Sequence, residues 1–354
     1  MRALVDHAPA LAPDLRFLLL KHPEFDGRLS EAPNVTEQVV RIGPNNPASM
    51  LFVRDLAPVS ECDVFHSPSN ILPARLGIKT VTTVHDIMWL THPNWCETGW
   101  KAPFKRAFYG FGLRRAIAHS DRIATVSEAT RNEIAAYEPQ SASRLTVTRS
   151  GVSERFRPSG VDADAPVLSG LPSGSNFALI VGQNAPYKNH ERALRAFVAA
   201  LGADKDAHAV FVQRQGESAS SLAATSNELG IADRVHFTGS VEEAKLIQLY
   251  RSARVLLHPS LCEGFGNPVA EAMACGLPVI TSDCSAMPEV AGGAARLVDP
   301  DDTASVSAAL SELWSDSAER ARMREAGLAR ARELDWADFA ATNVAIYREL
   351  LASG

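Results

Sequence analysis

Two glutamates that bracket a glycine-broken segment are the residues in this chain best suited to bind a ligand rich in hydroxyl groups. Glu263 directly precedes the tripeptide Gly-Phe-Gly, and Glu271 follows Glu263 after seven intervening residues. A carboxylate can accept two hydroxyl hydrogen bonds, so such a pair suits a polyol on each side of a bound group. The alternative is a helix-capping loop with two solvated glutamates, which is the commoner origin of an isolated pair.

The residues around this pair predict a strand, loop, helix, strand unit. Val255–Leu257 is too short an apolar run for a helix and suits a buried strand. Two glycines then break the chain, and residues 268–275 favour a helix with proline in its first turn. A Gly-Leu-Pro sequence ends this helix before a second strand at residues 279–281.

The start of this predicted helix is a candidate anion site. The amides of Phe265, Gly266 and Asn267 cluster there, and unpaired N–H groups together with the helix dipole attract an anion. We expect Glu263 in the loop and Glu271 in the first helical turn to flank that anion. A phosphate site with hydroxyl-binding groups on both flanks predicts a nucleotide sugar as the ligand.

The full string from EGFG to ACGLPV resembles the retaining glycosyltransferases of family 4, also called glycosyl transferases group 1, which have the GT-B fold. The string is long and specific. The resemblance implies that Glu263 and the amides of Gly264 to Gly266 hold the donor sugar hydroxyls. It also implies that Glu271 holds the ribose hydroxyls of the donor.

A second strand, glycine, loop and helix pattern predicts another phosphate contact. Residues 177–181 form the expected strand, Gly182 follows it, and Lys188 precedes a helix at residues 190–201. A lone lysine in a loop is usually solvated, but the resemblance implies that Lys188 grips the donor diphosphate. Many family members carry arginine where this chain has Gln183 and Tyr187, so we expect weaker diphosphate binding or help from another basic residue.

Two further positions take their expected roles from the resemblance. Val241 ends a Gly-x-Val turn that in the family meets the nucleotide base, largely through backbone groups. His85 follows the β-branched run Thr80–Val84, and the carboxyl end of a parallel strand faces the ligand crevice. The resemblance places His85 at the donor sugar; the alternative is a histidine satisfied by Asp86 or a backbone carbonyl.

Size and composition favour two domains. A chain of 354 residues with 46% hydrophobic content can bury two cores. We expect an N-terminal acceptor-side Rossmann-like domain at 1–157, a linker at 158–176, a C-terminal nucleotide-sugar domain at 177–334 and a crossover helix at 335–354. The expected fold is α/β, with two doubly wound domains facing across a cleft.

Charge and cysteine content exclude several classes of protein. The net charge of −6 comes from 35 basic and 41 acidic interspersed residues, so there is no basic footprint for nucleic acid. Five cysteines form no C-x-x-C pair, which argues against a zinc site or a disulfide framework. Asp162 and Asp164 form a D-x-D sequence, but it lies in the linker and follows no strand, so we discount it as a metal site.

The first residues lack an apolar core of signal-peptide length, and no run of about 18 apolar residues could span a membrane. We therefore expect a cytoplasmic protein. Residues 100–115 place Phe104, Ala107, Phe108 and Phe111 on one helical face with basic residues away from it. An ordinary core helix is the preferred interpretation; peripheral contact with anionic lipids at the inner face of the membrane is the alternative.

The beginning of the chain departs from the family pattern. Short strands are predicted at residues 16–20 and 39–42, but members of the family carry a further strand, loop and helix start ahead of the segment matching residues 2–20. An absent inner strand would leave its two neighbours with unpaired ladders. We therefore expect that the first domain lacks its N-terminal strand in this sequence and that the reading frame is truncated; the alternative is a domain that has lost its innermost strand.

The predicted reaction is transfer of a hexose, with a GDP-mannose-like donor favoured, to a hydroxyl of a glycan or lipid-linked acceptor. The resemblance implies retention of configuration without a metal ion or other cofactor. A GT-B-type epimerase or phosphorylase and a catalytically impaired nucleotide-sugar-binding protein remain alternatives. A dinucleotide oxidoreductase ranks last because no G-x-G-x-x-G follows any predicted strand.

Overall fold

The chain divides into two compact units. A computed structural model describes residues 2–43, 46–97, 100–158, 168, 170–172, 174–213 and 217–353, with backbone only for 217–220. Unit 1 comprises Met1–Gly151 and Asp335–Gly354, and unit 2 comprises Val152–Leu334. The C-terminal helix therefore belongs with the first part of the chain.

Unit 2 is built on a six-stranded parallel sheet in the order β12-β11-β10-β7-β8-β9. The strands are β7 Asn176–Val181, β8 Ala207–Val212, β9 Val235–Phe237, β10 Val255–His258, β11 Val279–Ser282 and β12 Arg296–Val298. The order reverses between β7 and β10, whose connections leave in opposite directions. In open parallel sheets, ligands bind beyond the carboxyl ends of the strands at such a reversal.

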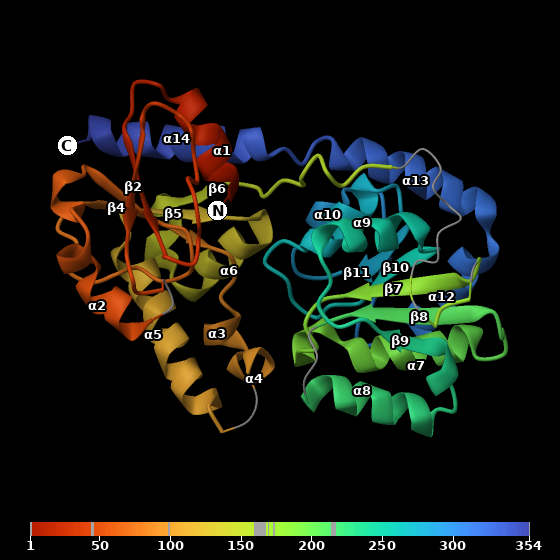
Figure 1. Ribbon diagram of the computed structural model, residues 1–354. Coiled ribbons are helices and arrows are strands. Elements are labelled where there is room, and N and C mark those ends of the chain that lie inside the picture. Colours follow the sequence, from red (N-terminus) through yellow and green to blue (C-terminus); the bar gives the residue numbers. More distant parts are fainter. Residues whose placement is uncertain are drawn as a thin grey trace. The chain divides into compact units, whose positions relative to one another are not determined.

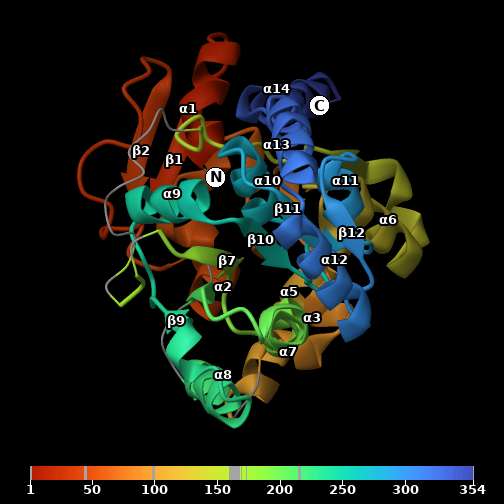
Figure 2. The same cartoon turned by 90° about the vertical axis from the view of Figure 1, so that its right-hand side faces the viewer.

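Helices cover both faces of this sheet. They are α7 His190–Leu201, α8 Glu217–Glu228, α9 Glu243–Ser252, α10 Asn267–Ala274, α11 Met287–Ala291, α12 Thr303–Ser315 and α13 Ser317–Ala331. Figures 1 and 2 show α9 and α10 on one face and α7 on the other. The main core lies between the central strands and α7 and α12, where Phe197, Phe211 and Leu310 are fully buried. Continuous apolar strands are what burial on both faces requires.

Unit 1 contains a four-stranded parallel sheet and a separate parallel pair. The sheet has the order β3-β4-β5-β6 and the pair is β1-β2. The strands are β1 Phe17–Lys21, β2 Val35–Val39, β3 Val64–Ser67, β4 Lys79–Val84, β5 Arg122–Thr125 and β6 Leu145–Val147. The strand predicted at residues 39–42 was wrong, because the observed strand β2 lies earlier and is largely polar. One of its faces is exposed, and Glu37 accepts hydrogen bonds from the amides of Leu29 and Ser30.

The helices of unit 1 are α1 Arg2–Leu11, α2 Pro47–Leu56, α3 Met88–Thr91, α4 Pro93–Cys96, α5 Ala102–His119, α6 Glu128–Tyr137 and α14 Trp336–Ala352. Ser127 caps α6 by accepting a hydrogen bond from the amide of Thr130. The long helix α14 packs along α1 (Figure 1). Among the described helices, none has both the length and the apolar composition needed to cross a bilayer.

Helix α5 does not pack through the face predicted from the sequence. Phe104 is 87% exposed and Phe111 is 54% exposed, so the aromatic face is turned away from the core. The helix instead packs through the opposite side, where Leu113 and Ile117 are buried. Gly112 permits this approach, because an added Cβ would lie only 2.8 Å from Ile71 Cγ1.

A buried polar contact fixes α14 to the sheet of unit 1. His66 on β3 lies between two hydroxyl groups: its Nδ1 is 2.5 Å from the Tyr347 hydroxyl and its Nε2 is 2.8 Å from Thr83 Oγ1. Burial lowers the pKa of His66 to about 3, so the ring is neutral at pH 7. A neutral imidazole has one donor and one acceptor, and both are used here.

We predict that Tyr347→Phe destabilises unit 1, because His66 Nδ1 loses its partner in a poorly hydrated environment. The expected loss in the free energy of unfolding is about 1 to 2 kcal/mol, measured by urea denaturation. Tyr137→Phe, which removes the hydroxyl of a tyrosine that is 42% exposed, serves as the control and should change the value by far less. Equal effects of the two substitutions would contradict the assigned role.

Candidate functional site

The candidate site of unit 2 forms where β7 and β10 end. Lys188 lies in the short 3-10 segment Pro186–Lys188 after β7, and Glu263 lies in the loop after β10. Because the two strands are adjacent and parallel, their carboxyl ends meet at one edge of the sheet. The structure brings these two predicted residues together: Lys188 Nζ donates to Glu263 Oε1 at 2.6 Å.

Three donors converge on that single carboxylate oxygen. Besides Lys188, Ser260 Oγ lies 2.7 Å and His258 Nε2 lies 3.1 Å from Glu263 Oε1. A carboxylate only accepts, so Nε2 carries the donated proton. His258 ends the fully buried strand β10 and is itself 2% exposed, so the strand fixes its position.

The surroundings keep Glu263 ionised. Burial alone raises the pKa of Glu263, but the charge of Lys188 and the hydrogen bond from His258 outweigh burial and lower the pKa to about 2. Both side chains of the ion pair are only 10% exposed. For His258, in contrast, burial lowers the pKa, so the imidazole is neutral near pH 7. The result is a fixed negative charge held in one orientation.

The backbone at Glu263 is also held from two sides. Ser285 Oγ accepts from the Glu263 amide at 3.0 Å and donates to the Glu263 carbonyl at 2.8 Å. Ser285 adopts a left-handed conformation with φ of 56°. Gly266 has φ of 99°, which residues with a side chain rarely adopt, and an added Cβ would also displace Met287, whose Cε would lie only 2.3 Å away.

The start of α10 presents amides in the way that the sequence indicates. Gly266 is the N-cap, without a side-chain cap, and its carbonyl accepts from the amides of Val269 and Ala270. Within the described part of the chain, no protein group accepts a hydrogen bond from the amides of Phe265, Gly266 and Asn267. Phe265 is buried, whereas Asn267 is exposed. This helix end can bind an anion through its amides.

Glu271 was placed incorrectly in the first turn of the helix. Because α10 begins at Asn267, Glu271 lies in the second turn, and its Oε2 accepts a 2.8 Å hydrogen bond from the hydroxyl of the fully buried Tyr250. Burial raises the pKa of Glu271, while Tyr250 and the charge of Lys188 oppose that rise. Lys188 therefore acts electrostatically on both glutamates of the pair.

The remaining predicted donor residues of unit 2 surround Lys188 or follow β9. Gly182 has φ of 141°, and a Cβ there would lie 3.2 Å from Lys188 Cε, so this glycine makes room for the lysine stem. Gln183 is exposed, Gly264 is half-buried and Val241 is half-buried beyond the turn at Gly239.

His85 belongs to unit 1 and is exposed at the end of β4. Its Nε2 lies 2.9 Å from the Pro68 carbonyl, and its amide donates to Asn70 Oδ1 at 2.7 Å. Since a carbonyl only accepts, Nε2 carries the proton and Nδ1 is an acceptor. Thr130 Oγ1 donates to the His85 carbonyl, which ties this strand end to α6.

His258, Ser260 and Ser285 are the functional residues that sequence reasoning missed. His258 reads as the end of an apolar strand, and Ser260 lies three residues before Glu263. The only available signal was that both occur between the strand and the glutamate. Ser285 is 22 residues from Glu263, so local patterns could not identify it.

The described residues include no group of three or more His, Cys, Asp or Glu side chains placed to hold a metal ion. Asp162 and Asp164 lie outside the described residues. The five cysteines are free thiols. Burial raises the pKa of Cys96 and Cys275 to about 12 and that of Cys284 to about 11, so these thiols are protonated at pH 7.

Two family models match this chain: Glycosyltransferase Family 4 over residues 5–156 and Glycosyl transferases group 1 over residues 165–330. The O-antigen chain mannosyltransferase B of Escherichia coli is 29% identical over 290 residues, covering 81% of this chain and 74% of that protein. The MMP alpha-(1->4)-mannosyltransferase of Mycolicibacterium hassiacum is 31% identical over 293 residues, covering 79% of this chain and 67% of that protein.

A solved structure shows the same fold. The crystal structure of Anabaena Alr3699/HepE in complex with UDP-glucose matches with a TM-score of 0.69 and 16% sequence identity, and the match covers 99% of this chain and 95% of that chain. The parallel sheets of the two units are those of two Rossmann-like domains. The chain belongs to the group 1 glycosyltransferases, and it is a glycosyltransferase with the GT-B fold.

Proposed function

We propose that the protein transfers a hexose, with mannose favoured, from a nucleotide diphosphate sugar to a hydroxyl of a glycan or lipid-linked acceptor. The transfer retains anomeric configuration and needs no metal ion. The observation that carries this proposal is the convergence of Lys188, His258 and Ser260 on one oxygen of Glu263. Such fixed geometry is what positioning of a sugar hydroxyl requires.

The second oxygen of Glu263 is the proposed sugar contact. Oε1 is occupied by three donors, whereas Oε2 has no protein donor among the described residues. An ionised carboxylate oxygen can accept hydrogen bonds from donor-sugar hydroxyls. The amides of Gly264 to Gly266 lie in the same loop and would contact the same sugar.

The leaving diphosphate would lie against the start of α10. Helix-end amides and the Lys188 charge stabilise negative charge that develops on the phosphate during transfer. Gly182 and Gln183 would lie beside the diphosphate, Glu271 would hold the ribose, and Val241 would lie against the base. The leaving oxygen would then accept the acceptor proton on the same face.

His85 is proposed to bind a sugar hydroxyl through Nδ1. The Pro68 carbonyl holds Nε2, which leaves Nδ1 as the acceptor. The side chains of Asn70 and Thr130 form hydrogen bonds with the amide and the carbonyl of His85, and these fix the strand end. A preference for mannose rests on the names of the two relatives, and a nucleotide sugar as donor is consistent with the UDP-glucose complex.

The test is incubation of the purified protein with UDP-, GDP- and dTDP-sugars and a glycan acceptor, with and without EDTA, followed by mass spectrometry and NMR of the product. A new glycosidic bond with the donor's configuration supports the proposal. Activity abolished by EDTA would count against transfer without a metal. A thermal-shift panel of the same nucleotide sugars identifies the preferred base and sugar.

We predict that Glu263→Ala lowers kcat/KM by more than about 100-fold, because misplaced sugar hydroxyls no longer align the reacting centre. Steady-state kinetics measure the loss. Glu312→Gln is the matched control, since Glu312 is an exposed acid of unit 2 paired with Arg296. A Glu263→Ala enzyme within threefold of the wild type would refute the role of this residue.

We also predict a pH-dependent effect of Lys188→Met. The folded pKa of Glu263, about 2, lies below its ordinary value of 4.5, so the ion pair stabilises the fold above pH 4.5 and this contribution is lost as pH falls toward 2. The variant should lose about 3 kcal/mol in free energy of unfolding at pH 7, and the difference should shrink between pH 4.5 and 2.

Denaturant titrations at several pH values measure this difference. The exposed Lys205 provides the control Lys205→Met, which should show a small difference at every pH. A loss from Lys188→Met that is constant between pH 7 and 3 would exclude an ionised Glu263 as its cause.

We further propose that the exposed face of α5 rests against anionic lipid. Trp100, which precedes α5, and Phe104 are each 87% exposed, and Phe111 continues the face of Phe104 about two turns further along the helix. Lys101 and Arg114 flank these rings and are exposed. Aromatic side chains inserted at the head-group level with basic residues beside them are typical of peripheral membrane contact, which suits a lipid-linked acceptor.

We predict that Phe104→Ser weakens binding to vesicles containing phosphatidylglycerol by about tenfold, because one large apolar side chain no longer leaves water. Vesicle sedimentation measures this binding, which should also fall with rising salt. Leu51→Ser, at a residue on α2 that is 47% exposed, should have little effect. Dimers that dissociate on Phe104→Ser, without any vesicle binding, would instead identify the face as a contact between copies.

A further inference from the structure

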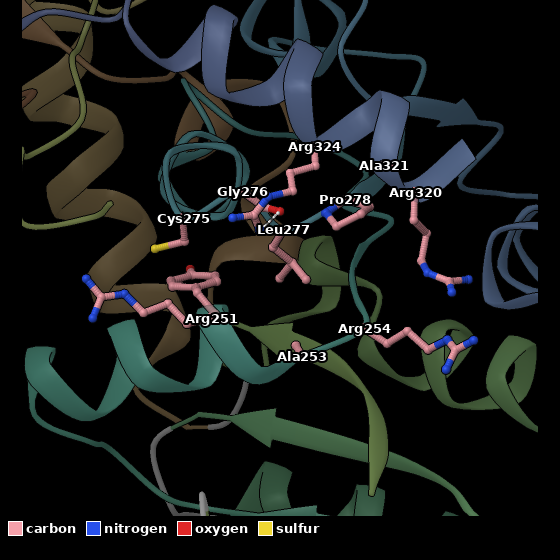
Figure 3. Close-up of a pocket in the computed structure, with 11 residues that line it drawn as sticks. Arg251, Ala253, Arg254, Cys275, Gly276, Leu277, Pro278, Arg320, Ala321 and Arg324 are labelled. Atoms are coloured by element: carbon pink, nitrogen blue, oxygen red, sulfur yellow. Dashed lines mark hydrogen bonds between the residues drawn. The ribbon is translucent and has the colours of Figure 1, made fainter. Parts of the chain in front are cut away.

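A cavity of about 220 Å³ lies at the opposite end of the unit 2 sheet from Glu263. It is bounded by Ala253, between α9 and β10, by Gly276 to Pro278 before β11, and by α13. Four arginines line it: Arg251, Arg254, Arg320 and Arg324 (Figure 3). Because β10 and β11 are parallel, this cavity borders their amino ends, whereas the candidate donor site borders the carboxyl ends.

The lining carries an excess of positive charge. It includes no aspartate or glutamate, and none of the four arginines forms a salt bridge with a carboxylate in the described parts of the chain. Compensation comes from the C-terminal ends of α9, α10 and α12, each worth about half a negative charge, and from Asp204, whose charge raises the pKa of Arg254. The four guanidinium charges still exceed these contributions.

Two of the arginines are close enough to repel each other. Arg254 donates to the Trp314 carbonyl through Nε at 3.0 Å and Nη2 at 2.7 Å, and Arg320 Nη1 donates to the same oxygen at 2.7 Å. Burial lowers the pKa of Arg254, and the charge of Arg320 lowers it further. Figure 3 shows the two guanidinium groups at the same end of the cavity. A bound anion would relieve this repulsion.

Donors remain for such an anion. Arg320 uses only Nη1, on the carbonyls of Leu313 and Trp314, and Arg324 uses only Nη1, on the Gly276 carbonyl. For Nε and Nη2 of both residues, the described part of the chain provides no acceptor. The planar guanidinium fork matches phosphate oxygens in bidentate fashion, which an ammonium group cannot do.

We propose that this cavity binds a phosphate-bearing anion of diphosphate size through the unused donors of Arg320 and Arg324. Arg254 contributes its charge only, because its three guanidinium nitrogens already donate to the Trp314 carbonyl and to Asn176 Oδ1. The cavity volume is below the range of about 300 to 1,000 Å³ that encloses drug-sized ligands, so a whole nucleotide sugar is too large. The site is separate from the proposed donor site and does not rest on it. The competing role of these arginines is capping of the C-terminal carbonyls of α10 and α12.

The test is isothermal titration of the full chain with pyrophosphate, in a Lys188→Met background that weakens any binding at the start of α10. We expect binding with a Kd below about 1 mM. Arg320→Gln should weaken this binding at least tenfold, because glutamine lacks the charge and the paired N–H donors of the guanidinium group. The glutamine amide can still donate to a helix-end carbonyl. Arg322→Gln is the matched control on the same helix, since Arg322 is exposed and paired with Glu319.

Circular dichroism and thermal unfolding establish that each variant is folded. If Arg320→Gln does not fold, Arg324→Gln replaces it, because Arg324 is exposed and its loss leaves the Trp314 contacts intact. In a second arm of the experiment, binding of the same variants to vesicles containing phosphatidic acid is measured. Pyrophosphate binding that depends on Arg320 or Arg324 supports a soluble ligand, and vesicle binding with the same dependence assigns the site to a lipid head group. No binding in either arm, or binding that both substitutions leave unchanged, overturns the proposal.

Discussion

The site in unit 2 depends on keeping one buried carboxylate ionised. Burial opposes the charge of Glu263, and an unpaired carboxylate at that position would take up a proton. Lys188 supplies the opposite charge, and His258 and Ser260 supply neutral donors to the same oxygen. Since each donor comes from the region where β7 or β10 ends, the ion pair also holds these two strand connections together.

The loop that carries Glu263 has little freedom to relax. Ser285 clamps both backbone groups of Glu263, and Gly266 sits in a conformation that residues with a side chain rarely adopt. The cost of these left-handed positions is offset by the buried helix α10, whose apolar residues pack against the sheet. The rigid helix therefore sets where the loop amides lie, and the loop in turn sets the direction of the carboxylate.

Much of this arrangement could be predicted from the sequence, but for unequal reasons. The strands and helices around Glu263 follow from apolar runs ended by glycine and proline, and α7 begins and ends at the predicted residues. That Lys188 and Glu263 serve one donor site followed only from family resemblance, because 75 residues separate them, and their ion pair was not predicted. Ser285 could not be found, since its role depends on the turn after β11 rather than on any local pattern.

The two wrong elements have one physical cause. Helix α5 has apolar residues on two opposite faces, and periodicity alone could not decide which of them is buried; Gly112, which lets the helix approach Ile71, decided it. Strand β2 carries polar side chains because one of its faces meets solvent. The strand was therefore predicted at the more apolar residues that follow it. In both cases the sequence pattern describes which side chains share a face, but the packing partner determines which face becomes the core.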